Sequence, residues 1–140
     1  MSQAPARILL GEDNPADVYL IRQALDENAI SYDLTVAVHG GEILEVVNTS
    51  GAAIPDLIVL DLNLPRHEGL EILKLIRATP ELERVPVAIL TSSDSPKDRL
   101  AASQLGATCY IRKPSNLDEF MDIGKTFHNL LSNRTASRSQ

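Results

Sequence analysis

The chain has 140 residues, of which 44% are hydrophobic and 23% charged, and it carries a formal net charge of −6 at pH 7. This length is typical of one domain, and the composition excludes a disordered or collagen-like chain. The acidic balance also argues against a nucleic-acid partner, because a negatively charged surface repels phosphate backbones.

The cysteine content and the apolar runs indicate where in the cell the protein is located. Cys109 is the only cysteine, so an internal disulfide is excluded, which fits a reducing environment. No apolar run approaches the roughly 18 residues that a membrane-spanning helix needs, and the first residues lack the apolar stretch of a signal peptide. We therefore expect a cytoplasmic protein that does not bind membranes.

The first half of the chain predicts two strands and two helices. An apolar strand over 8–10 is followed by a helix that begins at Pro15, with Asn14 as its N-cap. Proline suits the first helical position because its missing N–H would have no partner there. A second strand is predicted over 34–38, and a short helix over 43–47 follows it.

The second half of the chain continues this alternation. Strands and helices are predicted in turn over 57–60, 70–76, 85–90, 96–105, 108–111 and 117–127. Ser95 is the predicted N-cap of the fourth helix, Asp98 stands where a capping-box acid would reach back to it, and Gly106 is placed to end that helix. Continuous apolar strands that alternate with helices predict an α/β fold, with a doubly wound parallel sheet covered on both faces.

The last residues predict a tail. The segment 132–140 is polar, with two arginines and no acid, and we expect a flexible C-terminal tail after a domain over 1–131. This segment is too short to form an output domain.

Polar residues follow the predicted strands at the point where each strand ends. Glu12 and Asp13 follow the first strand, Asp61 the third, Thr91 the fourth and Lys113 the fifth. Because ligands of such sheets bind outside the carboxyl ends of the strands, we expect these side chains to share one edge.

Three carboxylates at one edge need opposite charge nearby. One like-charge pair at about 4 Å costs roughly 4 kcal/mol at an effective dielectric constant near 20. A divalent cation together with Lys113 would balance Glu12, Asp13 and Asp61, and oxygen ligands with open positions suit Mg²⁺. Taken singly, each signal is weak: Glu12 and Asp13 are better explained as a helix-start acid pair and Lys113 as a solvated cation, and Asp61 and Thr91 can be a turn residue and a loop hydroxyl. Their joint placement favours a site.

These residues, taken together, resemble those of a known family. The chain is similar to a response-regulator receiver domain over about 7–131, and more narrowly to single-domain regulators paired with phytochrome-type sensor kinases. The resemblance rests on the segments 8–14 and 61–65, on Gly69 and Thr91, and on the segments 106–107 and 110–114.

The resemblance implies a fold and a chemistry. The implied fold is flavodoxin-like, a five-stranded parallel sheet in the order 2-1-3-4-5. Asp61 would be the phosphoacceptor, which takes a phosphoryl group from the phosphohistidine of a kinase. Glu12 and Asp13, with the Asp61 carboxylate and the backbone carbonyl of Asn63, would hold Mg²⁺.

The resemblance also implies roles around the phosphoryl group. Thr91 and Lys113 would contact the phosphoryl oxygens, and Pro114 would follow a cis peptide bond that directs Lys113 inward. Tyr110 would be an aromatic switch coupled to the Thr91 hydroxyl, although a half-buried strand aromatic without a switch is a serious rival interpretation. The readout surface would combine the fourth helix, the fifth strand and the fifth helix.

The implied partners are a sensor histidine kinase or phosphotransfer protein and a downstream protein target, with the chain as monomer or homodimer. Such a protein catalyses only its own phosphorylation and dephosphorylation. Three alternative functions remain open. The first is an aspartate-nucleophile phosphatase, which would need an acid at the position of Asn63. The second is a flavodoxin-like cofactor binder, whose bound phosphate would be repelled by Glu12 and Asp13, and the third is a constitutive scaffold.

Gly11 departs from the family's usual pattern, which has a bulkier apolar residue before the acidic pair, and glycine weakens a strand end.

Overall fold

The computed structural model describes residues 4–48, 54–64 and 69–138, with no side-chain description at 47–48 and 133–138. Pro65, part of the motif that carries the family resemblance, lies outside the described residues. No described helix combines the length and apolarity that a membrane crossing would need.

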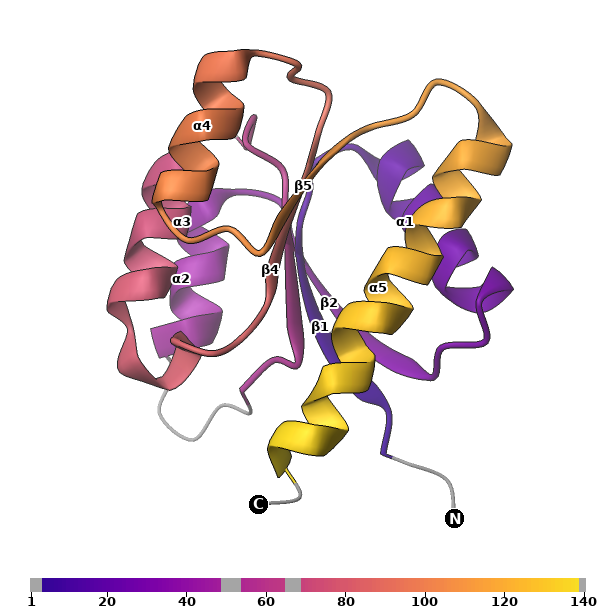
Figure 1. Ribbon diagram of the computed structural model, residues 1–140, viewed down its shortest axis with the longest axis horizontal. Helices are drawn as coiled ribbons and strands as arrows, with labels where there is room; N and C mark the ends of the chain where they lie inside the picture. Colours follow the sequence, from indigo (N-terminus) through magenta and orange to yellow (C-terminus); the bar gives the residue numbers. More distant parts are fainter. Residues whose placement is uncertain (1–3, 49–53, 65–68, 139–140) are drawn as a thin grey trace.

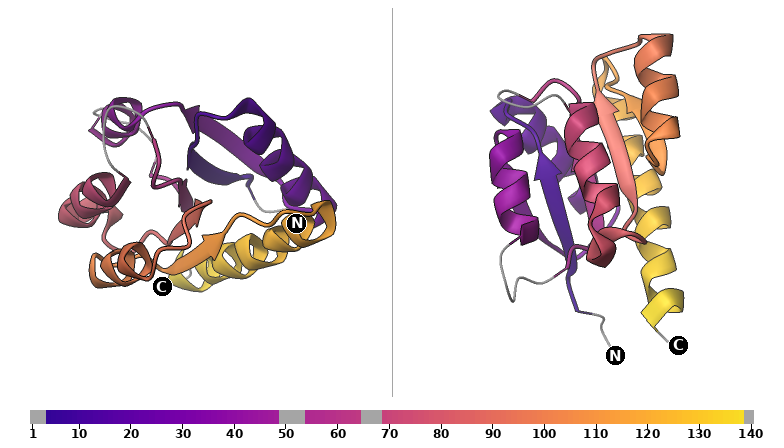
Figure 2. Two further views of the ribbon diagram at one scale, coloured as in Figure 1. Left: turned by 90° about the horizontal axis from the view of Figure 1, so that it is seen from above. Right: turned by 90° about the vertical axis from the view of Figure 1, so that its left-hand side faces the viewer.

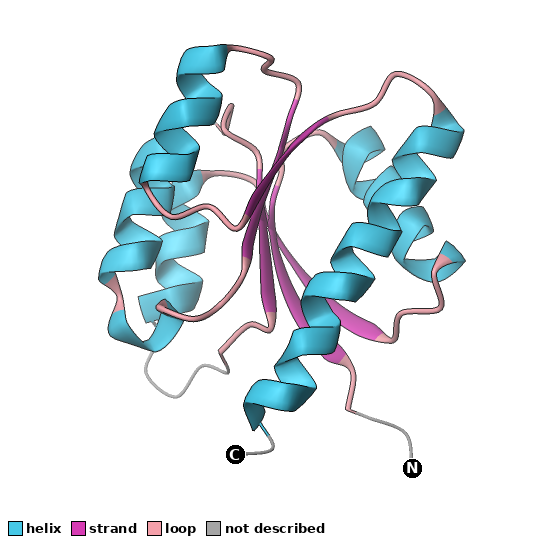
Figure 3. Cartoon of the chain, viewed as in Figure 1, coloured by secondary structure: helices cyan, strands magenta, loops and turns pink. Residues whose placement is uncertain are grey.

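Five strands form one fully parallel sheet in the order β2-β1-β3-β4-β5, which confirms the predicted fold (Figure 3). The strands are β1 (Ala6–Gly11), β2 (Tyr32–Ala37), β3 (Leu57–Leu60), β4 (Val87–Thr91) and β5 (Cys109–Arg112). Since the strands are parallel, their carboxyl ends meet at one edge, where the predicted polar residues follow them.

Helices cover both faces of this sheet. Helices α1 and α5 lie on one face, and α2, α3 and α4 lie on the other (Figures 1 and 2). Their bounds are α1 (Pro15–Glu27), α2 (Gly40–Asn48), α3 (Gly69–Ala78), α4 (Pro96–Gln104) and α5 (Leu117–Arg138), with a short 3₁₀ helix η1 (Pro80–Leu82) after α3.

The core consists of two apolar layers separated by the sheet. Along β1, Ile8 and Leu10 pack with the layer under α1 and α5, whereas Leu9 packs with the layer under the other helices. Both faces of the central strands are therefore buried, which explains their continuous apolar runs. Cys109 packs against the α1–α5 layer, and burial raises the pKa of its thiol.

The predicted helix caps are present, with one correction. The Asn14 side chain accepts a hydrogen bond from the Ala16 N–H at 2.9 Å, and the Ser95 hydroxyl accepts one from the Asp98 N–H at 3.3 Å. The Asp98 carboxylate does not close the expected capping box. It accepts a 2.7 Å hydrogen bond from the Ser93 hydroxyl, a charge-assisted bond that holds the loop before α4.

Helix α5 extends into the segment for which the sequence predicts a flexible tail. It continues to Arg138 and so includes 132–138. Once a helix has started, each added residue gains a backbone hydrogen bond, so polar residues without breakers continue it. The last two residues lie outside the described residues.

Helices α1 and α5 approach closely at Gly124. A Cβ atom there would collide with the Asn28 side chain and the Ala24 carbonyl oxygen of α1. The Asn28 amide donates to the Ala24 carbonyl at 2.9 Å and to the Met121 carbonyl of α5 at 3.1 Å. This contact ties the end of α1 to the first half of α5.

Candidate functional site

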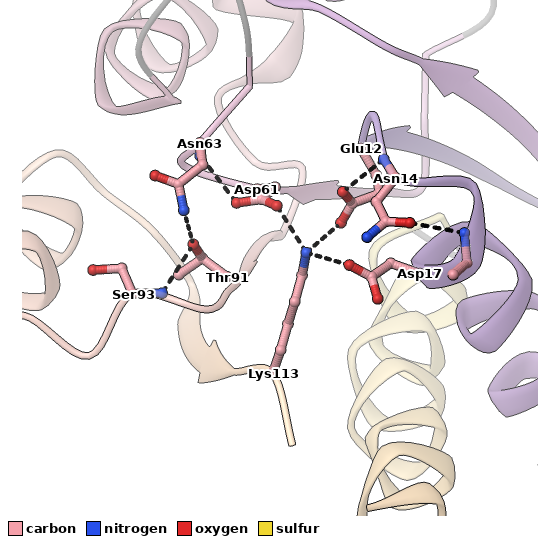
Figure 4. A network of polar contacts seen from close by, with 9 residues as sticks. Glu12, Asn14, Asp17, Asp61, Asn63, Thr91, Ser93 and Lys113 are labelled. Atoms are coloured by element: carbon pink, nitrogen blue, oxygen red, sulfur yellow. Dashed lines mark hydrogen bonds and ion pairs between the residues drawn. The ribbon is translucent and has the colours of Figure 1, made fainter. Parts of the chain in front are cut away.

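The carboxyl ends of four strands bring the predicted site residues together (Figure 4). Backbone bonds continue the ladder past the strands: the Glu12 N–H donates to the Ala37 carbonyl and the Asp61 N–H to the Gly11 carbonyl, both at 3.0 Å. These bonds fix the two acids at the sheet edge, where both are buried, Glu12 at 1% and Asp61 at 5% exposure.

Lys113 is the centre of the polar network. Its Nζ lies 2.7 Å from Glu12 Oε1, 2.7 Å from Asp17 Oδ2 and 2.8 Å from Asp61 Oδ2. An ammonium group has three N–H donors, and here each one meets a carboxylate. The side chain reaches these acids from the end of β5, as Figure 4 shows.

The expected cis bond before Pro114 is wrong for this structure. The described residues contain no cis peptide bond, so the Lys113–Pro114 bond is trans. The trans form of an X–Pro bond is favoured by roughly 0.5–1 kcal/mol unless the surroundings select the other form. Lys113 reaches its three carboxylates with the trans bond in place.

The acids outnumber the cation in this pocket. Three carboxylates face one ammonium, which leaves two formal negative charges unbalanced. Burial raises the pKa of the Glu12 carboxyl, and the hydrogen bond from Lys113 offsets this only in part. Burial acts to lower the pKa of Lys113, but hydrogen bonds to Asp17, Asp61 and Glu12 prevail and raise it. Lys113 therefore stays charged at neutral pH.

Asn63 links Asp61 to Thr91. The Asn63 N–H donates to Asp61 Oδ1 at 2.9 Å, and its side-chain amide donates to the Thr91 hydroxyl oxygen at 3.3 Å. The Ser93 N–H approaches the same hydroxyl oxygen at 3.4 Å. Thr91 is fully buried, so its hydroxyl is held in one environment between the acid and the loop before α4.

Tyr110 belongs to the neighbouring surface of β5 and α4. Its hydroxyl donates to the Ser93 carbonyl at 3.1 Å, and the Arg99 guanidinium lies over its ring at 4.5 Å from the centroid. Ser93 therefore connects Tyr110 with Thr91. The ring is half-buried and has a fixed polar partner at its hydroxyl.

The chain matches a family model described as the response regulator receiver domain over residues 8–124. It belongs to this family. A receiver domain is the phosphoacceptor module of two-component signalling and generally acts as a signalling protein, not as an enzyme. The sheet order and the acid edge described above agree with this assignment.

Relatives of this receiver domain include phytochrome regulators. The chain is 36% identical over 126 residues to response regulator Rcp1 of Synechocystis sp., which covers 87% of this chain and 86% of Rcp1. A crystal structure of the phosphorylated cyanobacterial phytochrome response regulator RcpA superposes with a TM-score of 0.83 and 35% identity, covering 91% of this chain and 94% of RcpA. The predicted resemblance to phytochrome-type regulators is thus confirmed.

Two further comparisons bear on cation binding and on length. A structure of the Mn²⁺-bound form of Rcp1 superposes with a TM-score of 0.80 and 34% identity, covering 87% of this chain and 91% of that one. The chain is also 35% identical over 117 residues to response regulator MprA of Mycolicibacterium vanbaalenii, with 84% of this chain covered. It spans about half the length of MprA, 48%.

The donor set of the receiver domain fits a divalent cation in charge and in chemistry. Glu12, Asp13 and Asp61 offer only hard oxygen ligands, and the two unbalanced charges around Lys113 match a dication. In the arrangement described, Lys113 pairs with Glu12 and Asp61, and Asp13 is exposed. Within 4–48, 54–64 and 69–138, no group of three His, Cys, Asp or Glu side chains is placed to hold a metal ion, and the three acids around Lys113 contact its ammonium instead.

The structure brings together Glu12, Asp61, Thr91 and Lys113, as the sequence pattern predicted, and adds one residue that it missed. Asp17 contacts Lys113 from the first turn of α1. The sequence signal for Asp17 is weak, because a carboxylate in the first turn of a helix is also explained by the helix dipole.

Proposed function

We propose that this receiver domain accepts a phosphoryl group on Asp61 from the phosphohistidine of a partner histidine kinase or phosphotransfer protein. The observation that carries the proposal is the buried Asp61 carboxylate, which lies 2.8 Å from the Lys113 ammonium at the carboxyl edge of the sheet. Similarity to RcpA and Rcp1 supports a phytochrome-type sensor kinase as the donor.

The transfer is a displacement at phosphorus. An Asp61 oxygen forms the new P–O bond, the P–N bond to the histidine breaks, and its electron pair stays on the imidazole nitrogen. Lys113 counters the charge on the transferring oxygens, and the Thr91 hydroxyl is placed to donate to one of them. In dephosphorylation, water takes the phosphoryl group from Asp61. The chain therefore catalyses only its own phosphorylation and its own dephosphorylation.

A divalent cation, Mg²⁺ by preference, completes the charge balance of this pocket. Glu12 and Asp13, with the Asp61 carboxylate and the Asn63 backbone carbonyl, would hold it. When bound, the cation supplies positive charge for the phosphoryl oxygens. The free thiol of Cys109 suits a reducing compartment, and we place the reaction in the cytoplasm.

The signal leaves the pocket through Thr91 and Tyr110. A phosphoryl group on Asp61 adds acceptor oxygens to which the Thr91 hydroxyl can donate, whereas Asn63 and Ser93 only donate to that hydroxyl, so the new bond draws Thr91 toward Asp61. Movement of Thr91 shifts Ser93, whose carbonyl accepts from Tyr110. We propose that this rearranges the surface of α4, β5 and α5, which a downstream protein target reads.

A mass measurement tests the acceptor. Incubated with Mg²⁺ and acetyl phosphate, the wild-type chain should gain the mass of one phosphoryl group, and Asp61→Asn should gain none. Asp33→Asn is the matched control, because Asp33 is an exposed aspartate on β2. Equal labelling of Asp61→Asn and the wild type would place the acceptor elsewhere and refute the proposal.

The phosphatase alternative lacks support in this geometry. The residue two positions after Asp61 is Asn63, whose amide donates a hydrogen bond to Thr91. An amide has no ionisable proton to give to a leaving group, so the second acid of such an enzyme is missing at this position. Turnover on a generic phosphate ester would reopen this alternative.

A further inference from the structure

Asp17 is a partner of Lys113 that the proposed phosphoacceptor chemistry leaves without a role. Its Oδ2 lies 2.7 Å from Lys113 Nζ, and the two side chains are 19% and 13% exposed. A charge-assisted hydrogen bond of this length between largely buried groups is stronger than an exposed surface ion pair.

A local helix-capping role does not account for Asp17. With Asn14 as N-cap, Asp17 occupies the position from which a capping-box acid would accept the Asn14 N–H. That N–H donates instead to Glu12 Oε2 at 3.2 Å. The Asp17 carboxylate is directed at Lys113, 96 residues away in the sequence (Figure 4).

The three carboxylates around Lys113 differ in what else they must do. Glu12 and Asp61 are proposed cation ligands, and phosphorylation replaces the Asp61 carboxylate charge with the charge of the phosphoryl oxygens, which the cation also contacts. Asp17 has neither duty, so its charge persists through the whole cycle. It also stands on the first turn of α1, where the helix dipole favours a carboxylate.

We propose that Asp17 is a positioning residue for Lys113, which keeps the ammonium in the pocket while the cation and the phosphoryl group engage Glu12 and Asp61. The inference rests on the proposed function. Without Asp17, Lys113 keeps only partners that the cation also needs, and ammonium and cation then compete for the same oxygens.

Cation affinity gives the first test, by a double-mutant cycle. Binding of Mn²⁺ is measured from the loss of its free electron paramagnetic resonance signal, without a phosphoryl donor. Asp17→Asn should weaken binding about three- to tenfold, a factor within the range that contacting residues show in such cycles. In a Lys113→Met background the same substitution should weaken it at most about twofold, because no ammonium competes. If Asp17→Asn weakened Mn²⁺ binding by the same factor in both backgrounds, Asp17 would act on the cation through its charge and not through Lys113, and the proposal would be overturned.

Phosphorylation kinetics give the second test, at a saturating Mg²⁺ concentration so that cation affinity no longer matters. Asp17→Asn should lower the maximal rate with acetyl phosphate about tenfold and leave the half-saturating donor concentration unchanged. Asp17→Glu, which keeps the charge, should recover most of the rate, and Asp26→Asn on the same helix should match the wild type.

The outcomes separate the two proposals. If Asp17→Asn reacts at the wild-type rate, or Asp17→Glu is as slow as Asp17→Asn, the positioning role is refuted while the acceptor assignment stands. If the wild-type chain gains no phosphoryl group, the proposed function fails, and the Mn²⁺ cycle still decides whether Asp17 holds Lys113. Urea unfolding of each variant confirms that it is folded.

Discussion

Gly69 shows how a residue without a side chain can fix the loop that carries Asp61. Its N–H donates to the Leu62 carbonyl at 3.0 Å. A Cβ atom at this position would lie 2.9 Å from the Asp61 carbonyl oxygen and would collide with the Leu62 Cα. Since these neighbours are backbone atoms, they cannot rotate away as the end of a side chain can.

We therefore expect Gly69→Ala to disturb both stability and chemistry. The free energy of unfolding should fall by about 1–3 kcal/mol, the usual cost of an extra carbon in a packed region. Phosphorylation of Asp61 should slow as its loop shifts. Urea unfolding and intact-mass kinetics measure the two effects.

Gly41→Ala is the control for this prediction. The nearest atoms to an added Cβ there belong to the His39 imidazole, at 3.1 and 3.2 Å, and a side chain can move. Its stability should stay within about 1 kcal/mol of the wild type, since alanine also favours the helix. An unchanged Gly69→Ala, or a Gly41→Ala as unstable as Gly69→Ala, would contradict this account.

At the scale of the elements, Arg77 joins segments that the sheet does not connect. From the last turn of α3, its Nη1 donates to the Val85 carbonyl at 2.8 Å and the Leu82 carbonyl at 3.1 Å, and its Nε donates to the Gly106 carbonyl at 2.9 Å. Gly106 has a positive φ of 96°, which turns the chain after α4. The planar guanidinium thus fixes η1, the entry to β4 and the turn before β5.

Arg77→Met should lower the free energy of unfolding by about 2–4 kcal/mol, because it removes several bonds from a charged donor and leaves carbonyls without partners. Arg77→Lys should restore little of this free energy of unfolding, since an ammonium group lacks the planar, forked set of N–H donors that reaches these carbonyls. Chemical denaturation of the metal-free protein measures both. Wild-type stability of Arg77→Lys would show that charge alone, and not the fork, matters.

The elements themselves were largely predictable from the sequence. The continuous apolar runs indicated buried parallel strands, and Asn14 and Ser95 marked helix starts that the structure confirms. The role of Gly11 was not predictable, because its meaning depends on distant residues. The Ile43, Leu60 and Leu64 side chains fill the space where its Cβ would lie, so the glycine serves packing at this strand end.

The site was predictable as a set of residues but not as a set of bonds. The pattern of strand ends predicted Glu12, Asp13, Asp61, Thr91 and Lys113 at one edge, and the structure joins all of them except Asp13, which is exposed. The pattern could not reveal that Asp17 completes the coordination of the Lys113 ammonium, because that contact depends on how α1 leaves the sheet. The topology of the sheet determines which residues come together, whereas the geometry of their side chains determines which atoms form hydrogen bonds.

At the scale of the whole molecule, the excess negative charge at the sheet edge predicts a dependence of stability on divalent cations. A cation that binds only the folded state stabilises it by about 2.7 kcal/mol at a concentration 100 times its dissociation constant. Mg²⁺ should therefore raise the thermal unfolding midpoint, and chelation should reverse the rise.

Two variants test which residues bind the stabilising cation. Asp61→Asn should lose most of the cation-dependent shift, because it removes a proposed ligand, and Asp33→Asn on β2 should retain it. If Asp61→Asn keeps the full shift, the cation binds elsewhere on the acidic surface and the proposed ligand set is wrong.

The contact of α1 with α5 at Gly124 has a consequence for exchanging parts between homologous proteins. Helix α1 carries Asp17, and α5 follows the strand that delivers Lys113, so these two distant parts of the sequence form one structural unit. A chimera that takes its first third from one parent and the rest from another would bring together helices that never evolved as neighbours. Crossover points that keep both ends from a single parent should give working hybrids more often.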